Sequence, residues 1–211
     1  MRDFLAITGP TTSGKTKLSM AVAELVDAEI VCMDSRQIYR GMDIGTDKAP
    51  SEFHERVPHH GLDMRAPDEA YSAGQFGRDA RRWITEIQGR CRVPLLVGGT
   101  GLFLKAVTDP IFRQPKMDPE RLRSLRRFLG SRSRSELERW VDRLDPARAV
   151  LARQGGPQRL SRTIELALLT GRPLSWWHEK GEPDQEPLTG VIVVLEMERE
   201  ELDRRIDARV T

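Results

Sequence analysis

The chain has 211 residues, of which 38% are hydrophobic and 31% are charged. This size and composition predict a globular protein with one α/β core and a smaller appended unit. No apolar run approaches the roughly 18 residues of a membrane-spanning helix, and no signal peptide precedes the first run, so we expect a cytoplasmic protein. The two cysteines, Cys32 and Cys91, are too few for a disulfide framework and are expected to remain free thiols.

The net charge of +2 conceals an asymmetry along the chain. Residues 113–172 contain 15 Lys and Arg against 7 Asp and Glu, a balance of +8, whereas the remainder carries 19 against 25, a balance of −6. A basic segment of this kind favours a ligand with a phosphate backbone. It is equally typical of a solvated helical surface rich in arginine, and charge alone does not decide between the two.

The first element to carry chemistry is a glycine loop. Residues 3–8 predict a strand and residues 15–26 a helix, and between them lies Gly9-Pro10-Thr11-Thr12-Ser13-Gly14-Lys15-Thr16, the pattern G-x-x-x-x-G-K-[ST]. The glycines let backbone N–H groups surround phosphate oxygens, Lys15 brings a positive charge, and the Thr16 hydroxyl is placed to hold Mg²⁺. We predict that this loop binds a diphosphate or triphosphate with magnesium; the alternative is a chance glycine turn.

Two further apolar runs predict strands that end at polar turns. Residues 28–33 end at Asp34, and residues 93–97 end at Gly98-Gly99-Thr100. Strands that alternate with helices predict a parallel sheet, whose ligands gather outside the carboxyl ends of the strands. We therefore expect the glycine loop, Asp34 and Thr100 to face one cleft.

The segment between these two strands contains turn residues and then one helix. Residues 39–46 are rich in turn residues, and a polar linker follows through residue 63. His59 and His60 are adjacent, which is not the spacing of a structural zinc site, so we interpret them as turn or cleft-wall residues. The apolar period predicts a helix over residues 76–88 with one face in the core.

The second half of the chain predicts a helical insertion followed by a return to the sheet. Pro110 and Pro115 mark a boundary, and the segment that follows predicts three helices, each with one apolar face. The first face is Leu122, Leu125 and Leu129, and the second is Leu137, Trp140, Val141 and Leu144. The third helix spans residues 158–170, and its apolar face is Leu160, Ile164, Ala167 and Leu168. Residues 191–195 are a β-branched run, and the last helix begins near Arg199. The predicted fold class is α/β, a three-layer P-loop fold with a parallel sheet. Its core is 1–112 plus 183–211, and its Arg-rich helical insertion is 113–182.

Asp34 is the candidate for the group that acts on a nucleophile. A carboxylate at the end of a strand in the phosphate cleft can accept a proton from an attacking atom. Ser35, Arg36 and Gln37 continue the same turn, and Gln37 carries an amide donor and acceptor that can read the edge of an adenine. A Mg²⁺ or water-shell ligand and a helix N-cap are the alternative roles for Asp34, and its position alone does not choose among them.

Several segments, in order along the chain, resemble the tRNA dimethylallyltransferases, which modify the adenine next to the anticodon. The segments are 9–16, 34–46, 59–63, 71–76 and 98–103, and the resemblance resumes at 158–162 and 169–175. It implies that the glycine loop holds the diphosphate of dimethylallyl diphosphate, with Lys15 and a Mg²⁺ ion at Thr16 neutralising the leaving group. It also implies that Asp34 accepts a proton from the adenine N6 amine and that Thr100 contacts the target nucleotide.

The resemblance assigns further residues to each ligand. The diphosphate-binding set is Gly9, Pro10, Thr11, Thr12, Ser13, Gly14, Lys15 and Thr16, with Arg205 and Arg209 from the last helix. The tRNA-binding set is Asp34, Ser35, Arg36, Gln37, Thr100, Gln158, Arg159, Leu160, Ser161 and Arg162. One more RNA-contacting arginine falls on either Arg121 or Arg123. For Arg205 and Arg209, a charged surface helix with acidic partners is the alternative interpretation.

Two features depart from the family pattern. The stretch Gln154-Gly155-Gly156-Pro157 replaces the sequence that many relatives carry before the third inserted helix, which puts the geometry of Arg159 in question. Relatives also continue with further helices where this chain ends, so we expect a shortened or minimal form. The expected partners are a tRNA anticodon stem-loop and dimethylallyl diphosphate, with no membrane, bound by a monomer. A nucleotide kinase and a non-catalytic tRNA-binding remnant are the alternative functions.

Overall fold

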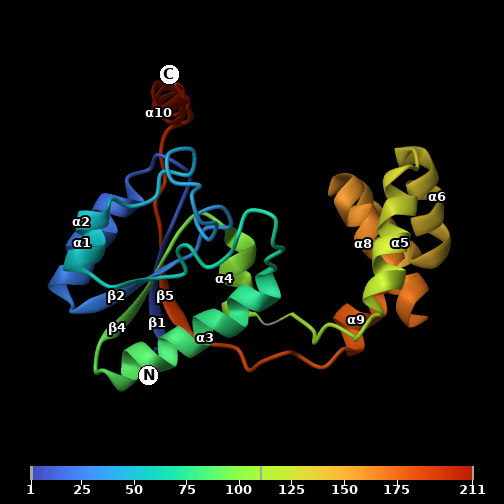
Figure 1. Ribbon diagram of the computed structural model, residues 1–211, viewed down its shortest axis with the longest axis horizontal. Coiled ribbons are helices and arrows are strands. Elements are labelled where there is room, and N and C mark those ends of the chain that lie inside the picture. The colour runs from blue at the N-terminus through green and yellow to red at the C-terminus, as the bar shows by residue number, and fades with distance from the viewer. Residues whose placement is uncertain (1, 110, 211) are drawn as a thin grey trace. The chain divides into compact units, whose positions relative to one another are not determined.

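The structure is a computed structural model that describes residues 2–109 and 111–210, except for the side chains of residues 209 and 210. It consists of two compact units, Met1–Pro110 with Gln185–Thr211, and Ile111–Asp184. Figure 1 shows the first unit as a sheet with helices and the second as a group of helices. Among the described residues, every helix is too short or too polar to cross a lipid bilayer.

In the described part of the first unit, five parallel strands form one sheet in the order β3-β2-β4-β1-β5. The strands are β1 (Phe4–Thr8), β2 (Ala28–Cys32), β3 (His59–His60), β4 (Val93–Val97) and β5 (Gly190–Val194). The parallel α/β sheet confirms the predicted fold class. Strand β3 was not predicted, because His59 and His60 form it only by pairing with Ile30 and Val31 of β2.

Helices cover both faces of this sheet, as the figure shows. The helices of the unit are α1 (Lys15–Leu25), α2 (Ser51–Arg56), α3 (Ala73–Gly89), α4 (Gly101–Thr108) and α10 (Arg199–Val210). Alternate side chains of a strand point to opposite faces. In β1, Phe4 and Ala6 pack with residues of α3 and α4, whereas Ile7 packs with Met20 and Ala23 of α1. This alternation gives three layers, with one apolar core on each face of the sheet.

Strand β5 is the edge of the sheet and is much less covered than its neighbours. It pairs in register with β1, so residues 190–194 return to the sheet as predicted. Val191, Ile192, Val193 and Val194 are each between 42% and 58% exposed. Since successive residues face opposite sides, neither face of β5 is buried by the described residues.

The second unit is helical around its own apolar core. Its helices are α5 (Pro119–Gly130), α6 (Arg134–Leu144), α7 (Ala149–Gln154), α8 (Gly156–Thr170) and α9 (Leu174–Lys180), with a 3₁₀ turn at Pro146–Arg148. Asp118 caps α5 by accepting from two backbone N–H groups, and Ser133 and Glu136 form a capping box on α6. The buried core consists of Leu129, Leu137, Val141, Ala149, Ala152, Leu160 and Ile164.

The inward face of α8 differs from the prediction. Leu160 and Ile164 are buried as expected, but Leu168 is 42% exposed and Leu166 is fully buried in its place. Helices α5, α6, α7 and α9 all contact α8, so its buried residues do not form a single stripe. Helices α7 and α9 are too short to show a periodic stripe, and the sequence did not reveal them.

A buried carboxylate joins strands β2 and β3 to the turn between α3 and β4. Glu29 of β2 has a side chain that is only 3% exposed, and it accepts two hydrogen bonds of 2.8 Å from the guanidinium of Arg90. His60 of β3 lies 2.7 Å from the same carboxylate, and Arg92 lies 3.6 Å away. Hydrogen bonding from Arg90 outweighs burial and holds the pKa of Glu29 at about 2.

Replacing Glu29 tests this ion cluster. Because the folded pKa of about 2 lies below the usual 4.5, the carboxylate stabilises the fold above about pH 4.5 and loses that effect as pH falls toward 2. The depression corresponds to on the order of 3 kcal/mol. We expect Glu29→Gln to lower the free energy of unfolding, measured with urea, at about pH 7. The difference in unfolding free energy between the variant and wild type should become much smaller at about pH 3.

Glu24→Gln is the matched control, because Glu24 pairs with Arg56 at an exposed site. Its effect should stay below about 1 kcal/mol. A gap between wild type and Glu29→Gln that does not change with pH would contradict the assigned pKa.

Candidate active site

The glycine loop leads from β1 into α1 with the backbone that its sequence predicts. Gly14 precedes α1 in a left-handed conformation with φ of +87°, and no side chain caps that end of the helix. The N–H groups of the first helical turn therefore face outward with the positive end of the helix dipole. This is the geometry that binds an anion at a helix N-terminus.

Two side chains of the loop have polar groups that bear on its predicted role in binding phosphate. The Lys15 ammonium donates to the backbone oxygens of Gly9 at 3.1 Å and Pro10 at 2.5 Å, so it is folded over the loop. The Ser13 hydroxyl is buried and has no hydrogen-bond partner among the described residues. A buried hydroxyl without a partner costs free energy, which a ligand oxygen at the loop would recover.

Asp34 is held in place through one of its two carboxylate oxygens. Oδ1 accepts from the N–H of Arg36 at 2.8 Å and of Gln37 at 3.4 Å, which closes a turn directly after β2. The turn is not the start of a helix, so Asp34 is not a helix N-cap. Among the described residues Oδ2 has no hydrogen-bond partner, and it remains available to a ligand.

Thr100 ties the turn after β4 to the turn after β2. Its hydroxyl oxygen accepts from the N–H of Ser35 at 3.1 Å, which leaves the hydroxyl hydrogen to donate elsewhere. Gly98, two residues earlier, lies so close to β2 that an added Cβ would stand 2.0 Å from the Met33 oxygen. The two turns therefore meet because position 98 has no side chain.

These turns line one cleft of about 970 Å³, as the strand order predicts. The lining residues are Gly9, Pro10, Thr11, Thr12, Gly14, Lys15, Thr16, Lys17, Asp34, Ser35, Arg36, Gln37, Gly45, Thr46, Asp47, Lys48, Ala49, Pro50, Phe53, Gly99, Thr100, Arg205 and Ala208. The glycine loop, Asp34 and Thr100 come from three turns that are far apart in sequence. Their convergence places the glycine loop and a carboxylate on the walls of the same cavity.

Helix α10 also reaches this cleft. Arg205 donates to the backbone oxygen of Thr12 at 3.4 Å and pairs with Glu201 at 2.6 Å. It thus has an acidic partner on its own helix and also touches the glycine loop. The side chain of Arg209, its predicted companion, lies outside the described residues.

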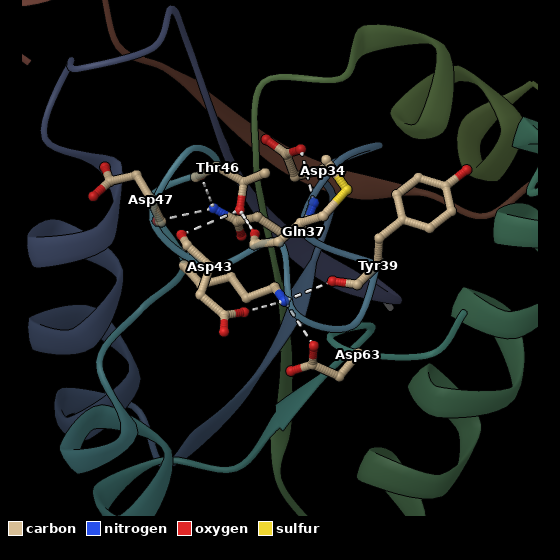
Figure 2. Close-up of polar contacts among 9 residues, drawn as sticks. Asp34, Gln37, Tyr39, Asp43, Thr46, Asp47 and Asp63 are labelled. Carbon is tan, nitrogen blue, oxygen red and sulfur yellow. Dashed lines mark hydrogen bonds and ion pairs between the residues drawn. The ribbon is translucent and has the colours of Figure 1, made fainter. Parts of the chain in front are cut away.

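One wall of the cleft is a braced loop that the sequence did not reveal. Lys48 donates to the Tyr39 oxygen at 2.7 Å and to the carboxylates of Asp43 and Asp63 at 2.6 Å each, and Figure 2 shows these three groups around one ammonium. Burial alone would lower the pKa of Lys48, but the hydrogen bonds to Asp43 and Asp63 raise it. The sequence signal, a lysine among aspartates in a turn-rich segment, is too general to identify this arrangement.

The role predicted for the Gln37 amide as a donor to adenine is not supported. Its Nε2 donates to the backbone oxygens of Thr46 at 2.9 Å and Asp47 at 3.0 Å (Figure 2). Both amide hydrogens are therefore used within the loop, and only Oε1 can face a ligand. Gln37 lines the cleft, but it also braces the wall.

The predicted RNA-contacting residues of α8 differ in their accessibility. Leu160 is fully buried, so its side chain cannot contact a ligand, which corrects that prediction. Arg162 is largely buried and lies 3.4 Å from Glu165, and Arg126 pairs with the same carboxylate at 2.9 Å. Gln158 and Arg159 are exposed, and Ser161 is half-buried.

The glycine pair before α8 accommodates the Arg159 side chain. An added Cβ at Gly155 would lie 2.3 Å from Cδ of Arg159, so the arginine packs over Gly155 and would have to move if this position carried a side chain. Arg159 also donates to the Leu151 oxygen at 3.3 Å. Arg121 and Arg123 are both exposed on α5, and Arg123 lies 4.0 Å from Glu120, so the structure does not choose between them as RNA contacts.

Comparison with known proteins gives consistent family matches. The model of the family described as IPP transferase matches residues 37–211. The chain is 41% identical over 206 residues to the tRNA dimethylallyltransferase of Halorhodospira halophila, covering 97% of this chain and 66% of that protein. It is 40% identical over 205 residues to the enzyme of the same name from Geobacillus kaustophilus, covering 97% and 65%. The chain thus spans just under two thirds of these relatives.

Solved structures agree with the fold. The full-length tRNA isopentenylpyrophosphate transferase of Bacillus halodurans superposes with a TM-score of 0.62 and 36% identity, covering all of this chain and 65% of that one. A eukaryotic dimethylallyltransferase acting on tRNA gives a TM-score of 0.79 over all of this chain and 52% of that one. At 24% identity, the second likeness shows the fold alone.

Gly98→Ala tests the close approach on which the cleft depends. Because the new Cβ would overlap the Met33 oxygen, β2 and the turn after β4 must separate. We expect a loss of about 2–3 kcal/mol in unfolding free energy and weaker binding of inorganic diphosphate by calorimetry. Gly101→Ala is the control, since an added Cβ there meets nothing within 4 Å. Equal stability and equal diphosphate binding in the two variants would refute the constraint.

Proposed function

Because the chain belongs to the IPP transferase family, we propose that it transfers a dimethylallyl group from dimethylallyl diphosphate to the N6 amine of adenosine 37 in tRNA, releasing diphosphate. The observation that carries the proposal is the single cleft shared by the glycine loop and Asp34. The loop suits a diphosphate, and the carboxylate suits a nucleophile that must lose a proton. The names of the relatives support tRNA as the acceptor and a dimethylallyl group as the group transferred.

The diphosphate would be held by polar groups of the glycine loop, of the start of α1 and of α10. The outward N–H groups of the first turn of α1 and the orphaned Ser13 hydroxyl match phosphate oxygens. Lys15 can exchange its bonds to loop oxygens for bonds to phosphate. Arg205, which already touches the loop, adds a second cation. Together these groups would stabilise the charge that develops as the allylic C–O bond breaks.

Mg²⁺ fits the donors of this cleft. Mg²⁺ prefers oxygen ligands and binds through one or two protein groups together with phosphates and water. The Thr16 hydroxyl lines the cleft at the start of α1, where it can supply one such oxygen. When bound, the ion would neutralise part of the charge on the leaving diphosphate.

Asp34 and Thr100 would act on the adenine. As N6 attacks the allylic carbon, a C–N bond forms, the C–O bond to diphosphate breaks, and the amine proton passes to Oδ2 of Asp34. The bonds to Oδ1 hold this carboxylate in one orientation during the transfer. The Thr100 hydroxyl, whose oxygen already accepts from Ser35, can donate its hydrogen to a ring nitrogen of the base. An adenine reaches this cleft only after leaving its stack.

The helical unit would contribute to binding the anticodon stem-loop. Its residues 113–172 carry a charge balance of +8, which suits the phosphate backbone. Arg159 is the α8 arginine that combines exposure with a fixed location over Gly155. Arg126 and Arg162 are instead engaged by Glu165 and contribute to the fold.

The decisive experiment is mass analysis of tRNA nucleosides after incubation with the chain, Mg²⁺ and dimethylallyl diphosphate. We expect prenylated adenosine, and we expect Asp34→Asn to reduce its rate of formation by about 10²–10⁴-fold while stem-loop affinity changes little. Asp68→Asn, at an exposed position outside the cleft, should leave the rate unchanged.

Two outcomes would contradict the proposal. Phosphoryl transfer from ATP to a nucleotide, without prenylation, would identify a kinase. Stem-loop binding without any product would identify a non-catalytic RNA-binding protein. Full turnover in Asp34→Asn would reject the base assignment while leaving the reaction in place.

Arg159→Ala tests the helical unit. If Arg159 contacts a phosphate, its loss should weaken stem-loop binding about fivefold, with the slope of log affinity against log salt falling by about one. Arg143→Ala, another exposed arginine of the same unit, is the control for net charge. Equal effects of the two substitutions in a salt series would show that only overall charge matters.

A further inference from the structure

The loop between β2 and α2 exposes an isoleucine beside the cleft. Ile44 is 98% exposed, and Met42, two residues earlier, is 38% exposed. Single exposed apolar residues are common and need no explanation by themselves. The surroundings of Ile44 are what distinguish it from residues such as Leu25, which is 84% exposed at the end of α1.

Hydrogen bonds within the loop hold the backbone that carries Ile44. The Ile44 oxygen accepts from the N–H of Asp47 at 3.2 Å, and the Thr46 hydroxyl donates to the Met42 oxygen at 2.5 Å. The N–H of Lys48 donates to the Asp43 oxygen at 3.2 Å, which closes the turn around Ile44. An apolar side chain is thus displayed on a rigid support.

Two polar side chains connect this turn to the rest of the cleft wall. The buried ammonium of Lys48 joins it to Asp63 and Tyr39, and the Gln37 amide joins it to the turn that positions Asp34 (Figure 2). Such bracing limits the freedom of the turn to fold Ile44 inward. Lys48 also offsets one of the two negative charges of Asp43 and Asp63, which reduces their repulsion of a phosphate backbone.

The exposed turn borders a second hollow that is continuous with the cleft. This hollow of about 510 Å³ is lined by Arg36 and residues 41–46. Arg36, Gly45 and Thr46 line both cavities. The Arg36 guanidinium is exposed and has no ion-pair or hydrogen-bond partner among the described residues, so it is available to stack on a base or meet a phosphate.

We propose that Ile44, together with Met42, is an apolar wedge that packs against the nucleobase adjacent to the adenosine drawn into the cleft. The inference rests on the proposed function, because it requires one base to occupy the cleft. Removing a base from a stack uncovers the apolar face of its neighbour, and proteins that distort nucleic acids commonly cover such faces with aliphatic side chains. The hollow beside Ile44 would receive that neighbour, with Arg36 against its edge or phosphate.

A double-mutant cycle between protein and RNA tests the wedge. Wild type and Ile44→Ser are assayed with an anticodon stem-loop and with two versions that are abasic at the 5′ or the 3′ neighbour of the target. We expect Ile44→Ser to lower kcat/KM at least fivefold on the intact RNA. On the RNA that lacks the contacted base, the same substitution should change kcat/KM less than twofold.

Matched measurements separate this contact from a structural effect. Thermal unfolding and KM for dimethylallyl diphosphate should not change in Ile44→Ser, since the side chain is almost fully exposed. Leu25→Ser replaces another exposed apolar residue that lines neither cavity, and it should behave as wild type with all three RNAs. Ile44→Phe, which keeps an apolar surface, should retain most of the activity.

The double-mutant cycle is repeated with the dissociation constants of the same three RNAs in place of kcat/KM, so that the test does not depend on turnover. If Ile44→Ser weakens all three RNAs equally, or none of them, the wedge is overturned in either readout. If wild type forms no prenylated adenosine but the binding cycle still shows coupling, the proposed reaction fails and the wedge stands. If wild type turns over and the cycle is additive, the reaction stands and the wedge fails.

Discussion

The contact between the backbone at Gly98 and the carbonyl of Met33 is the constraint on which the cleft depends. An added Cβ at Gly98 would lie 2.0 Å from the Met33 oxygen, so only glycine allows β4 to end this close to β2. The neighbouring N–H groups complete the junction, since Gly98 donates to Ile7 at 3.2 Å and Met33 donates to Val97 at 2.7 Å. The turns after β1, β2 and β4 are thereby brought together at the carboxyl ends of the three central strands.

Some polar groups around these turns have all their hydrogen-bond partners within the protein, and others have donors or acceptors that a ligand could use. The ammonium of Lys48 and the amide nitrogen of Gln37 are fully occupied within the loop wall, which they stiffen. One oxygen of Asp34, the hydroxyl of Ser13 and the hydrogen of Thr100 remain available. A rigid wall with a few hydrogen-bonding groups left for ligands can orient two substrates without rearranging.

The helical unit shows that a surface rich in ion-paired arginine accounts for part of its basic composition. Glu165 engages Arg126 and Arg162, and Glu138 engages Arg134 at 2.8 Å, so part of the positive charge serves the fold and the helix surface. Arg159 is exposed and packs over a glycine. Net charge therefore overstates the number of arginines that a nucleic acid could contact.

The sequence by itself determined the glycine loop, the main strands and helices of the α/β core and the family resemblance, because these depend on local spacing and periodicity. Only the tertiary structure decided features in which distant segments meet. Strand β3 exists because β2 is beside it, the inward face of α8 depends on four neighbouring helices, and Lys48 is buried because Asp43 and Asp63 reach it from both sides. The sequence did predict that Asp34 and the glycine loop share a cleft, because the carboxyl ends of parallel strands lie on one side of a sheet. Only the structure gives the strand order β3-β2-β4-β1-β5, which makes their turns neighbours, because no local pattern encodes that order.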